Sequence, residues 1–296
     1  MSPTNPAPMR RSPAKTIAFQ GQAGAYSDLA CREVYPDMAT MPCDSFEEVI
    51  AAVRTRRARL AMLPIENSVA GRVADIHHLM PDSGLHIIGE QFQRVNHCLL
   101  APKGATLKTV KTVRSHVHAL NQCRSLIREL KLKPIVAVDT AGAAAEIAAR
   151  GDKSEAAIAS ELAAQIYKLA ILRRDAEDAA HNTTRFLVMS KTPRIASPAD
   201  GVCITTFVFR VRNVPAALYK ALGGFATNGV NMTKLESYML GGRFYATQFY
   251  SDIEGHPSER RVKLALDELK FFSHEVKILG VYPAHPFRLA ADRGED

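Results

Sequence analysis

A segment with two prolines, KTPRIASPADG at residues 191–201, separates two parts of the chain whose apolar residues follow different patterns. Beyond it, the runs predict strand, helix, strand, strand, helix and strand, the βαββαβ order of a ferredoxin-like domain. Before it, short apolar runs alternate with helical segments, which predicts an α/β sheet covered by helices. We therefore expect a linker at 193–200 and a different fold on each side of it.

The first part, residues 15–192, starts its alternation of strands and helices twice, at KTIAFQ and again near Thr109. After the second start we predict a helix over about 119–130 and helices in the runs AGAAAEIAAR and ELAAQIYKL. Between these starts, residues 84–101 are typical of extended strands. We predict two α/β lobes joined by crossover strands, with a cleft between them, as in periplasmic-binding proteins. Ser27 and Ser45 are expected to cap the first two helices, and Glu48 completes a capping box with Ser45.

The second part has its six predicted elements within residues 201–285, and we expect tails at 1–14 and 286–296. The N-terminal tail holds four prolines and no hydrophobic stretch, which argues against a secretory signal. The predicted elements are the runs GVCITTFVFRV, VPAALYKALGGFATN, GVNMTKLESYML, GRFYATQFYSDI, PSERRVKLALDELK and EVKILGVYP.

The chain carries 38 Lys and Arg against 30 Asp and Glu, a formal net charge of +8 at pH 7. This balance is typical of proteins that bind nucleic acid, an anionic surface or an acidic small molecule. Tryptophan is absent, and no run interleaves basic and aromatic residues as RNA-binding sheets do. No apolar run approaches the roughly 20 residues needed to cross a bilayer. We expect a negatively charged metabolite as partner, with no nucleic acid and no membrane.

The five cysteines, at 31, 43, 98, 123 and 203, lack the spacing of zinc or redox sites. Their odd number suits a reducing compartment, so we expect a cytoplasmic protein. The histidine pairs His77-His78 and His116-x-His118 lack the i, i+4 spacing that would place two imidazoles on one helical face. We expect neither a metal nor another cofactor.

Four segments place polar residues where a predicted strand ends or a helix begins: GQAGAYS (21–27), PIENSVAG (64–71), SHVHALNQC (115–123) and HNTTRF (181–186). Each has a structural explanation, because such residues also form turns and helix caps. The turn at 21–27 lacks both G-x-G-x-x-G and a P-loop lysine, but its N–H groups could bind a carboxylate. Arg185 is costly beside a core strand unless it has a bidentate partner.

Together with the second part, these segments resemble prephenate dehydratase, a lyase of phenylalanine biosynthesis, over residues 15–285. The family's Asn-x-Thr-Arg-Phe motif matches 182–186, its Glu-Asn-Ser motif 66–68 and its Ser-His motif 115–116. The first turn departs from the family's Gly-Pro-x-Gly-Thr, since Gln22 replaces the proline and Ala25 the threonine. Val117 and His118 likewise replace the usual proline and glutamine.

The resemblance implies a cofactor-free reaction in which prephenate, a dicarboxylate, loses CO2 and its ring hydroxyl to become aromatic phenylpyruvate. It implies that Thr184 and Arg185 are catalytic, Thr184 by a hydrogen bond to the leaving oxygen and Arg185 by binding a carboxylate. The substrate-binding residues that it implies are Ala23, Gly24, Ser27, Glu66, Asn67, Ser68, Ser115, Asn182 and Phe186.

Strand geometry limits this assignment. In a regular strand Asn182, Thr184 and Phe186 share one face, while Arg185 points to the other. Thr184 and Arg185 can both reach one substrate only where the strand entrance is irregular; otherwise Arg185 has a supporting role. Glu66 would be repelled by a dianion, so we expect it to pair with a cation or to be hydrogen-bonded.

The second part resembles the family's ACT regulatory domain, which implies feedback inhibition by phenylalanine. Because such a unit exposes sheet edges, we expect a homodimer or homotetramer. The family's Gly-Ala-Leu appears at 216–218 with Ala216 in place of glycine, so affinity or selectivity for the effector is expected to be altered. The implied effector-binding residues are Ala217, Leu218, Asn231, Glu236 and Ser237.

Two alternatives stay open at this point. Arogenate dehydratase acts on the aminated analogue of prephenate, and sequence alone separates the two substrates poorly. A non-catalytic module that binds a small anion can also have two α/β lobes around a cleft, as solute-binding proteins and the sensor parts of transcription regulators do. A transcription regulator would be expected to carry a helix-turn-helix before the lobes, and none is found in this sequence.

Overall fold

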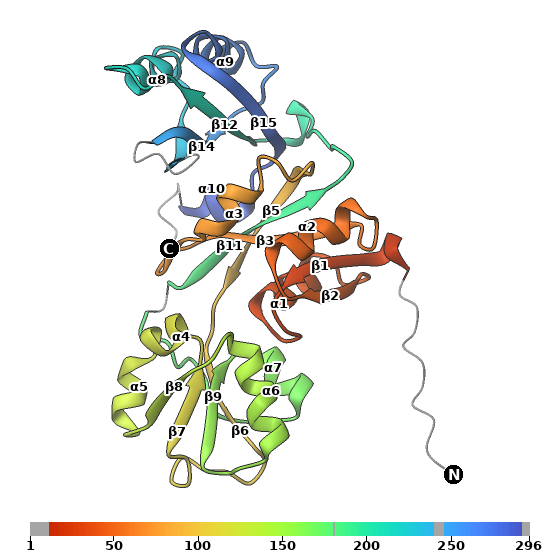
Figure 1. Ribbon diagram of the computed structural model, residues 1–296, viewed down its shortest axis with the longest axis vertical. Coiled ribbons are helices and arrows are strands. Elements are labelled where there is room, and N and C mark those ends of the chain that lie inside the picture. Colours follow the sequence, from red (N-terminus) through yellow and green to blue (C-terminus); the bar gives the residue numbers. More distant parts are fainter. Residues whose placement is uncertain (1–11, 180, 240–245, 292–296) are drawn as a thin grey trace. The chain divides into compact units, whose positions relative to one another are not determined.

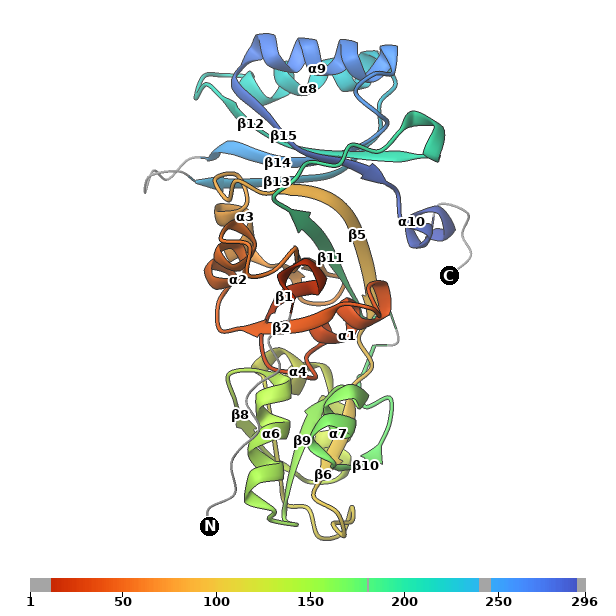
Figure 2. The ribbon, with the colours of Figure 1, turned by 90° about the vertical axis from the view of Figure 1, so that its right-hand side faces the viewer.

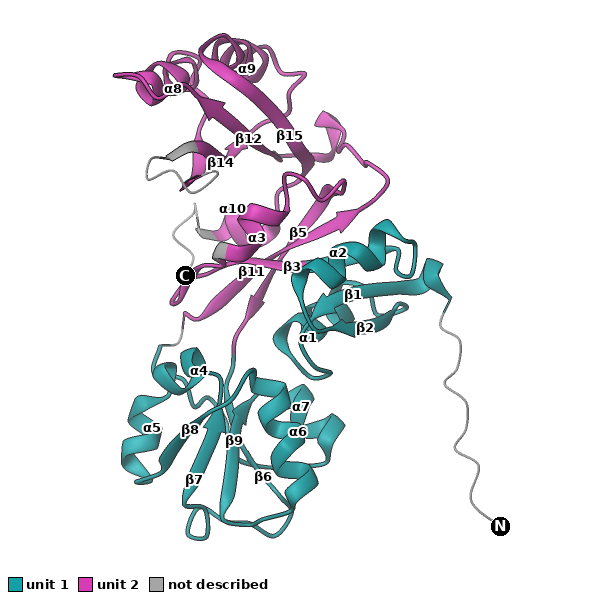
Figure 3. Ribbon diagram, in the orientation of Figure 1, with its two compact units in different colours: residues 1–62, 96–180 teal, residues 63–95, 181–296 magenta. Residues whose placement is uncertain are grey.

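The computed structural model describes residues 12–179, 181–239 and 246–291, and its contacts divide the chain into two compact units (Figures 1 and 3). The first unit comprises 1–62 and 96–180, and the second comprises 63–95 and 181–296. The strands form two sheets accompanied by helices, so the chain has an α/β fold. Most of the predicted tail 1–14, residues 242–245 of a predicted strand and residues 292–296 lie outside the described residues.

The first unit contains a small parallel group of strands and a five-stranded sheet. β1 (Thr16–Gln20) pairs in parallel with β2 (Ala39–Cys43) and with the start of β3 (Leu60–Asn67); α1 (Tyr26–Val34) follows β1, and α2 (Phe46–Arg54) follows β2. The five-stranded sheet has the order β10-β6-β9-β7-β8. Its strands are β6 (Cys98–Ala101), β7 (Thr112–Ser115), β8 (Lys133–Val136), β9 (Glu155–Ala159) and β10 (Ala170–Arg173), and the helices between them are α4 (Val117–Gln122), α5 (Arg124–Glu129), α6 (Thr140–Arg150) and α7 (Glu161–Tyr167).

Only some of the helices in this unit begin as the local sequence predicts. Ser45 accepts a hydrogen bond from the N–H of Glu48 at the start of α2, as predicted. The prediction that Ser27 caps α1 is wrong, because α1 begins at Tyr26 without a side-chain cap and Ser27 is buried in its first turn. The single helix predicted over 119–130 is divided into α4 and α5.

In the second unit a sheet runs in the order β13-β14-β12-β15-β5-β11-β3. β15 and β5 meet in parallel at one close pair, Gly280 and Ile87. A Cβ atom at position 280 would lie 2.2 Å from the carbonyl oxygen of Ile87, so glycine is required for the strands to approach. The elements that precede the C-terminal part are β4 (Gly71–Arg72), α3 (Ala74–Leu79), β5 (His86–Arg94) and β11 (Thr183–Ser190).

The C-terminal elements occur in the predicted βαββαβ order. The four strands pair antiparallel, and α8 and α9 cover one face of them (Figure 2). Phe207, Phe209 and Phe225 contribute to the apolar core beneath these helices. The elements are β12 (Cys203–Val211), α8 (Ala217–Thr227), β13 (Met232–Met239), β14 (Ala246–Glu254), α9 (Arg260–Phe272) and β15 (Ser273–Pro283).

Among the α-helices and strands, five short elements have no counterpart in the sequence-based prediction: β2, β4, α3, β10 and α10 (Pro286–Ala291). Helix α10 lies where the sequence predicts a tail. Its Arg288 forms ion pairs with Glu90 and Asp252 of the second unit. No helix in the described parts of the chain is long and apolar enough to span a membrane.

Candidate functional site

The turn at 21–27, in the first unit, uses its polar backbone groups internally. The N–H of Gly24 donates to the buried carboxylate of Asp28 at 2.9 Å. The carbonyl groups of Ala23 and Gly24 accept hydrogen bonds from the side chains at the start and end of α7. Asp28 thus places a negative charge in the first turn of α1. This position would otherwise favour an anion, so the arrangement disfavours a substrate carboxylate at this turn.

Ser115 and His116, also in the first unit, have structural partners. Ser115 is fully buried at the end of β7, and its hydroxyl donates to the carbonyl of Ile158 at 2.6 Å. His116 is the N-cap of α4, and its Nδ1 accepts from the N–H of His118 at 3.3 Å. Hydrogen bonding and helix capping therefore account for both polar residues of this segment.

In the second unit, the predicted site residues meet at the start of β11. β3 and β4 form a hairpin over residues 66–72, in which Glu66 lies opposite Arg72. Ser68, in the turn of this 66–72 hairpin, exchanges backbone and side-chain hydrogen bonds with Thr183, at 2.9 Å each. Its hydroxyl also donates to the carbonyl of His181 at 2.7 Å. Ser68 thereby holds the hairpin against the first residues of β11.

Asn67 sets the orientation of the Thr184 hydroxyl group. The side-chain oxygen of Asn67 accepts from the N–H groups of Val69 and Ala70, at 3.0 and 2.7 Å, so its amide nitrogen must point the other way. That nitrogen donates to Asn182 Oδ1 at 2.8 Å and to Thr184 Oγ1 at 2.9 Å. Thr184 Oγ1 is thus an acceptor toward Asn67. Within the described residues its own hydrogen has no acceptor, which leaves it able to donate to a ligand.

Arg185 points away from this arrangement, to the opposite face of β11, as regular strand geometry requires. It is 2% exposed, and its guanidinium pairs with Glu66 at 2.9 Å, Glu90 at 2.8 Å and Asp252 at 2.6 Å. Tyr282 accepts a further bond at 3.0 Å. The protein therefore supplies the partners that a buried arginine needs. This geometry favours a role for Arg185 in stabilising β11 over a direct contact with substrate.

Two further cations join this buried charge network. Lys234 pairs with Glu66 at 2.5 Å, and Arg288 pairs with Glu90 at 2.7 Å. Burial alone would raise the pKa of Glu66 and of Asp252, but nearby positive charge, Arg185 foremost, holds both pKa values below their usual range. The expectation that Glu66 pairs with a cation agrees with these contacts.

Sequence patterns did not single out Glu90, Asp252 and Lys234. The sequence feature that could have identified them is weak, because each is only a charged residue inside an otherwise apolar or alternating strand run. Phe186 and Asn182, which the resemblance assigns to substrate, are each only 1% exposed. Phe186 belongs to the core of the sheet, and Asn182 contacts Asn67 instead of facing open solvent.

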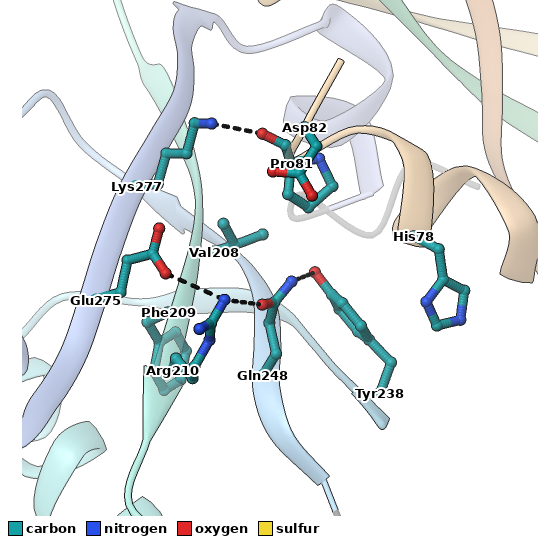
Figure 4. Close-up of a pocket in the computed structure, with 10 residues that line it drawn as sticks. All are labelled: His78, Pro81, Asp82, Val208, Phe209, Arg210, Tyr238, Gln248, Glu275 and Lys277. Carbon is teal, nitrogen blue, oxygen red and sulfur yellow. Dashed lines mark hydrogen bonds and ion pairs between the residues drawn. The ribbon is translucent and has the colours of Figure 1, made fainter. Parts of the chain in front are cut away.

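A pocket in the second unit lies elsewhere, between the end of α3 and the C-terminal strands (Figure 4). Among its polar side chains, Arg210 pairs with Gln248 and Glu275, and Gln248 pairs with Tyr238. None of the predicted catalytic or substrate-binding residues lines it. Among the residues that the structure describes, no group of three or more His, Cys, Asp or Glu side chains is arranged to hold a metal ion.

Comparison with known proteins identifies the family. Residues 17–194, more than half of the chain, match the family model described as Prephenate dehydratase. The chain belongs to the prephenate dehydratase family. A Komagataeibacter europaeus protein named bifunctional N-acyl-homoserine lactone acylase/prephenate dehydratase is 57% identical over 274 residues, covering 93% of this chain and 98% of that protein. Arogenate dehydratase/prephenate dehydratase 2 of Arabidopsis thaliana is 37% identical over 276 residues, covering 90% and 72%.

Two solved structures have folds similar to that of this chain. The prephenate dehydratase of Arthrobacter aurescens, in complex with L-Phe, has a TM-score of 0.83 at 30% identity, covering 95% of this chain and 98% of that chain. A structure described as a novel type of quorum quenching acylase has a TM-score of 0.87 at 56% identity, covering 92% and 99%.

The residues that family membership suggests for effector binding do not all face the same point within this dehydratase-family chain. Glu236 pairs with Arg72 and Lys234, each at 3.3 Å, whereas its neighbour Ser237 lies on the opposite, exposed face of β13. Asn231 donates to Glu254 at 3.1 Å and precedes Glu236 by roughly 16 Å of strand. Ala217 begins α8, and Leu218 packs against the core of the C-terminal part.

Ala216 has a left-handed backbone, with φ at 60°, immediately before α8. A Cβ atom in this conformation costs roughly 1–2 kcal/mol, partly offset by the greater freedom of glycine in the unfolded chain. Ala216→Gly should therefore raise the free energy of unfolding by about 1 kcal/mol, as measured by thermal and urea denaturation. Ala226→Gly, inside the same helix, is the control and should lower it by a similar amount. Equal losses in the two variants would contradict this account of Ala216.

Proposed function

We propose that the chain is a prephenate dehydratase that converts prephenate into phenylpyruvate, CO2 and hydroxide in phenylalanine biosynthesis. The observation that carries the proposal is the Asn67–Thr184 hydrogen bond, in a chain that belongs to the family. Because Asn67 donates to Thr184, the threonine hydroxyl keeps its hydrogen available for another acceptor. In this reaction that acceptor is the ring oxygen as it leaves.

The chemistry needs a placed donor more than a strong acid. The bond between the ring and the carboxylate breaks, its electron pair completes the aromatic ring, and the bond to the hydroxyl group breaks. Negative charge grows on the departing oxygen, and a hydrogen bond from Thr184 is strongest at that stage, so it lowers the barrier. The departing hydroxide takes its proton from solvent.

The other residues have graded roles in the proposal. Asn67 orients Thr184, while Asn182 and Ser68 hold Asn67 and the hairpin in place. Arg185 stabilises the strand that carries Thr184 and is not proposed to touch the substrate. The remaining substrate contacts rest on the family resemblance alone: Ala23, Gly24, Ser27, Glu66, Ser115 and Phe186.

Purified protein incubated separately with prephenate and with arogenate tests the proposal. Phenylpyruvate from prephenate, followed by its absorbance in alkali, is the expected product. Phenylalanine from arogenate at a higher kcat/KM would instead support arogenate dehydratase, a name that the plant relatives share. No product from either substrate at any protein concentration would contradict the proposal and favour a binding module.

Feedback inhibition by phenylalanine is part of the proposal. Its support is the βαββαβ order of the C-terminal elements, which fits an ACT domain over 201–285, and the L-Phe complex of the Arthrobacter aurescens relative. Because the suggested ligand groups do not all face the same point within this chain, we propose a homodimer or homotetramer in which two copies complete the effector site. Cytoplasmic location stays an expectation from the isolated cysteines.

Acylase activity is a second candidate, because the name of the Komagataeibacter europaeus relative includes it. Amide hydrolysis through a side-chain nucleophile needs that nucleophile to be activated. Thr184 Oγ1 faces an amide donor that cannot take its proton, and burial raises the pKa of the Cys43 and Cys98 thiols to about 11. Release of homoserine lactone from an acylated substrate by the pure protein would establish this activity beside the first.

A further inference from the structure

The 66–72 hairpin has polar contacts on two sides. On one side Asn67 and Ser68 are hydrogen-bonded to the segment 181–184 that leads into β11 and includes Thr184. On the other side the hairpin contacts β13, the strand in which the sequence places part of the effector motif. No other described hairpin joins these two segments.

The contacts with β13 are ionic. Lys234 pairs with Glu66 at 2.5 Å, and Arg72 pairs with Glu236 at 3.3 Å and donates to the carbonyl of Ser237 at 3.1 Å. Lys234 also pairs with Glu236 at 3.3 Å. The four charges thus alternate in sign: Arg72, Glu236, Lys234, Glu66. The Lys234 side chain is only 9% exposed, so these interactions are screened less than those of a surface pair.

Aromatic packing adds to the same contact. α3 follows the hairpin directly, and the ring of its His77 lies edge-on to Tyr250 of β14, with centroids 4.9 Å apart. Tyr250 is the register partner of Glu236 on β13. The ring of His78 lies edge-on to Tyr238 at 5.3 Å. The segment 66–79 therefore contacts β13 and β14 through both charges and rings.

The hairpin is short, so few covalent bonds separate the residues that contact β13 from those that contact the segment 181–184. Glu66, which faces Lys234, is bonded through one peptide group to Asn67, which orients Thr184. Asn67 also closes the hairpin turn through the N–H groups of Val69 and Ala70. We therefore expect a change in the position of Glu66 or Arg72 to move these hydrogen bonds.

We propose that the 66–72 hairpin couples β13 to Thr184, so that Lys234 and Arg72 act as positioning residues for the hydroxyl group of Thr184. An ammonium-bearing ligand that pairs with Glu236 would compete with Arg72 and Lys234, and the hairpin would lose its ionic contacts. Such a ligand inhibits only through its different affinity for the two arrangements of the hairpin. This regulatory consequence rests on the proposed function; the physical coupling does not.

Hydrogen exchange of the full-length protein tests the coupling without any substrate or effector. The variants are Lys234→Met and Arg72→Gln, and the matched control is Arg210→Gln. Arg210 also forms an ion pair on the C-terminal sheet, with Glu275 at 3.2 Å, and is 44% exposed against 47% for Arg72 (Figure 4). In both variants the amides of residues 68–70 and 183–184 should exchange roughly fivefold faster or more, and in the control they should not.

Neither altered side chain touches residues 183–184, so faster exchange there reports transmission through the hairpin. Unchanged exchange at 68–70 and 183–184 in both variants would overturn the proposal. Should Lys234→Met fail to fold, Arg72→Gln decides alone, because the Arg72 side chain is half exposed and its loss leaves no buried charge without a partner.

Phenylalanine titration gives the second readout. Because Arg72→Gln removes a competitor for Glu236 and an ionic contact of the hairpin, calorimetry should show phenylalanine binding at least as tight as in wild type. The ratio of dehydratase activity without phenylalanine to that at saturating phenylalanine should fall roughly fivefold or more. Arg210→Gln should keep the wild-type value. Binding and inhibition that both match wild type would count against the coupling. A wild-type protein without dehydratase activity would contradict the proposed function and leave the exchange experiment to decide the coupling.

Discussion

Thr184→Ala is expected to lower kcat for prephenate by about 10²- to 10³-fold while KM changes much less. The reason is that the hydroxyl group provides a hydrogen bond that becomes strong only as the ring oxygen leaves, and losing one such donor typically has this effect on the transition state. Steady-state kinetics with prephenate, with circular dichroism to verify folding, measures the result. Thr184→Ser, which keeps the hydroxyl group, should retain most of the activity.

Two variants sharpen this test. Thr183→Ala removes a hydroxyl group one residue earlier, which has no hydrogen bond among the described residues, and it should leave kcat nearly unchanged. Asn67→Asp keeps the oxygen that accepts from Val69 and Ala70 but removes the donor to Thr184. Thr184 would then donate to the aspartate instead of the substrate, so kcat should fall by a factor comparable to that of Thr184→Ala. Wild-type turnover in Thr184→Ala would make the threonine a structural residue only.

Arg185→Met should lower the free energy of unfolding by about 3–5 kcal/mol, because it leaves buried carboxylates without their cation. Three carboxylates lie within 2.9 Å of the guanidinium, and Glu90 and Asp252 have fully buried side chains. Urea denaturation at neutral pH measures the loss. Arg173→Met is the matched control, since Arg173 pairs with Glu129 at 2.8 Å on the surface, and it should cost at most about 1 kcal/mol.

The pH dependence of this loss has a definite sign. The pKa values of Glu66 and Asp252 are lowered from ordinary values of 4.5 and 3.8, so the unfolded chain binds more protons than the folded chain in acid. Their stabilising contribution is present above those ordinary values and disappears as pH falls through the lowered pKa values. The difference between wild type and Arg185→Met should therefore be largest at neutral pH and shrink below pH of about 4.

The sequence alone suggests that Arg185→Lys raises KM, on the assumption that the guanidinium binds a substrate carboxylate. The structure changes that expectation. A lysine cannot make the forked contacts with three carboxylates and Tyr282, so its main effect should be on stability. A normal unfolding free energy with a KM raised tenfold would restore the direct substrate contact and contradict the supporting role of Arg185.

Local patterns were enough to predict much of the fold and to select the residues of the proposed site. The alternation of apolar runs predicted β1, β3, β11 and the helices α2, α6 and α7, because side-chain burial on one face of a strand or helix leaves a period in the sequence. The same patterns predicted the order of the six C-terminal elements. The polar residues at 66–68 and 182–184 were found because each follows or precedes an apolar run abruptly.

Local patterns also predicted which way Arg185 points. Alternation along a regular strand places it opposite Thr184, and β11 keeps a regular register with β5 from Thr183 to Val188. What lies on that opposite face could not be read from the strand. The short elements β2, β10 and α10 escaped prediction because a few residues carry too little periodicity to identify them.

The sequence by itself thus determined the order of the longer secondary-structure elements, the family and the side chains that are proposed to carry the chemistry. The tertiary structure alone decided their partners. Arg185 lies 119, 95 and 67 residues away from Glu66, Glu90 and Asp252, and the Asn67–Thr184 bond spans 117 residues. Such pairs depend on the order and register of non-consecutive strands, which follow from how whole faces pack and not from local periodicity. For that reason the sequence could suggest Arg185 as a carboxylate-binding residue but only the fold could show that the carboxylates are the protein's own.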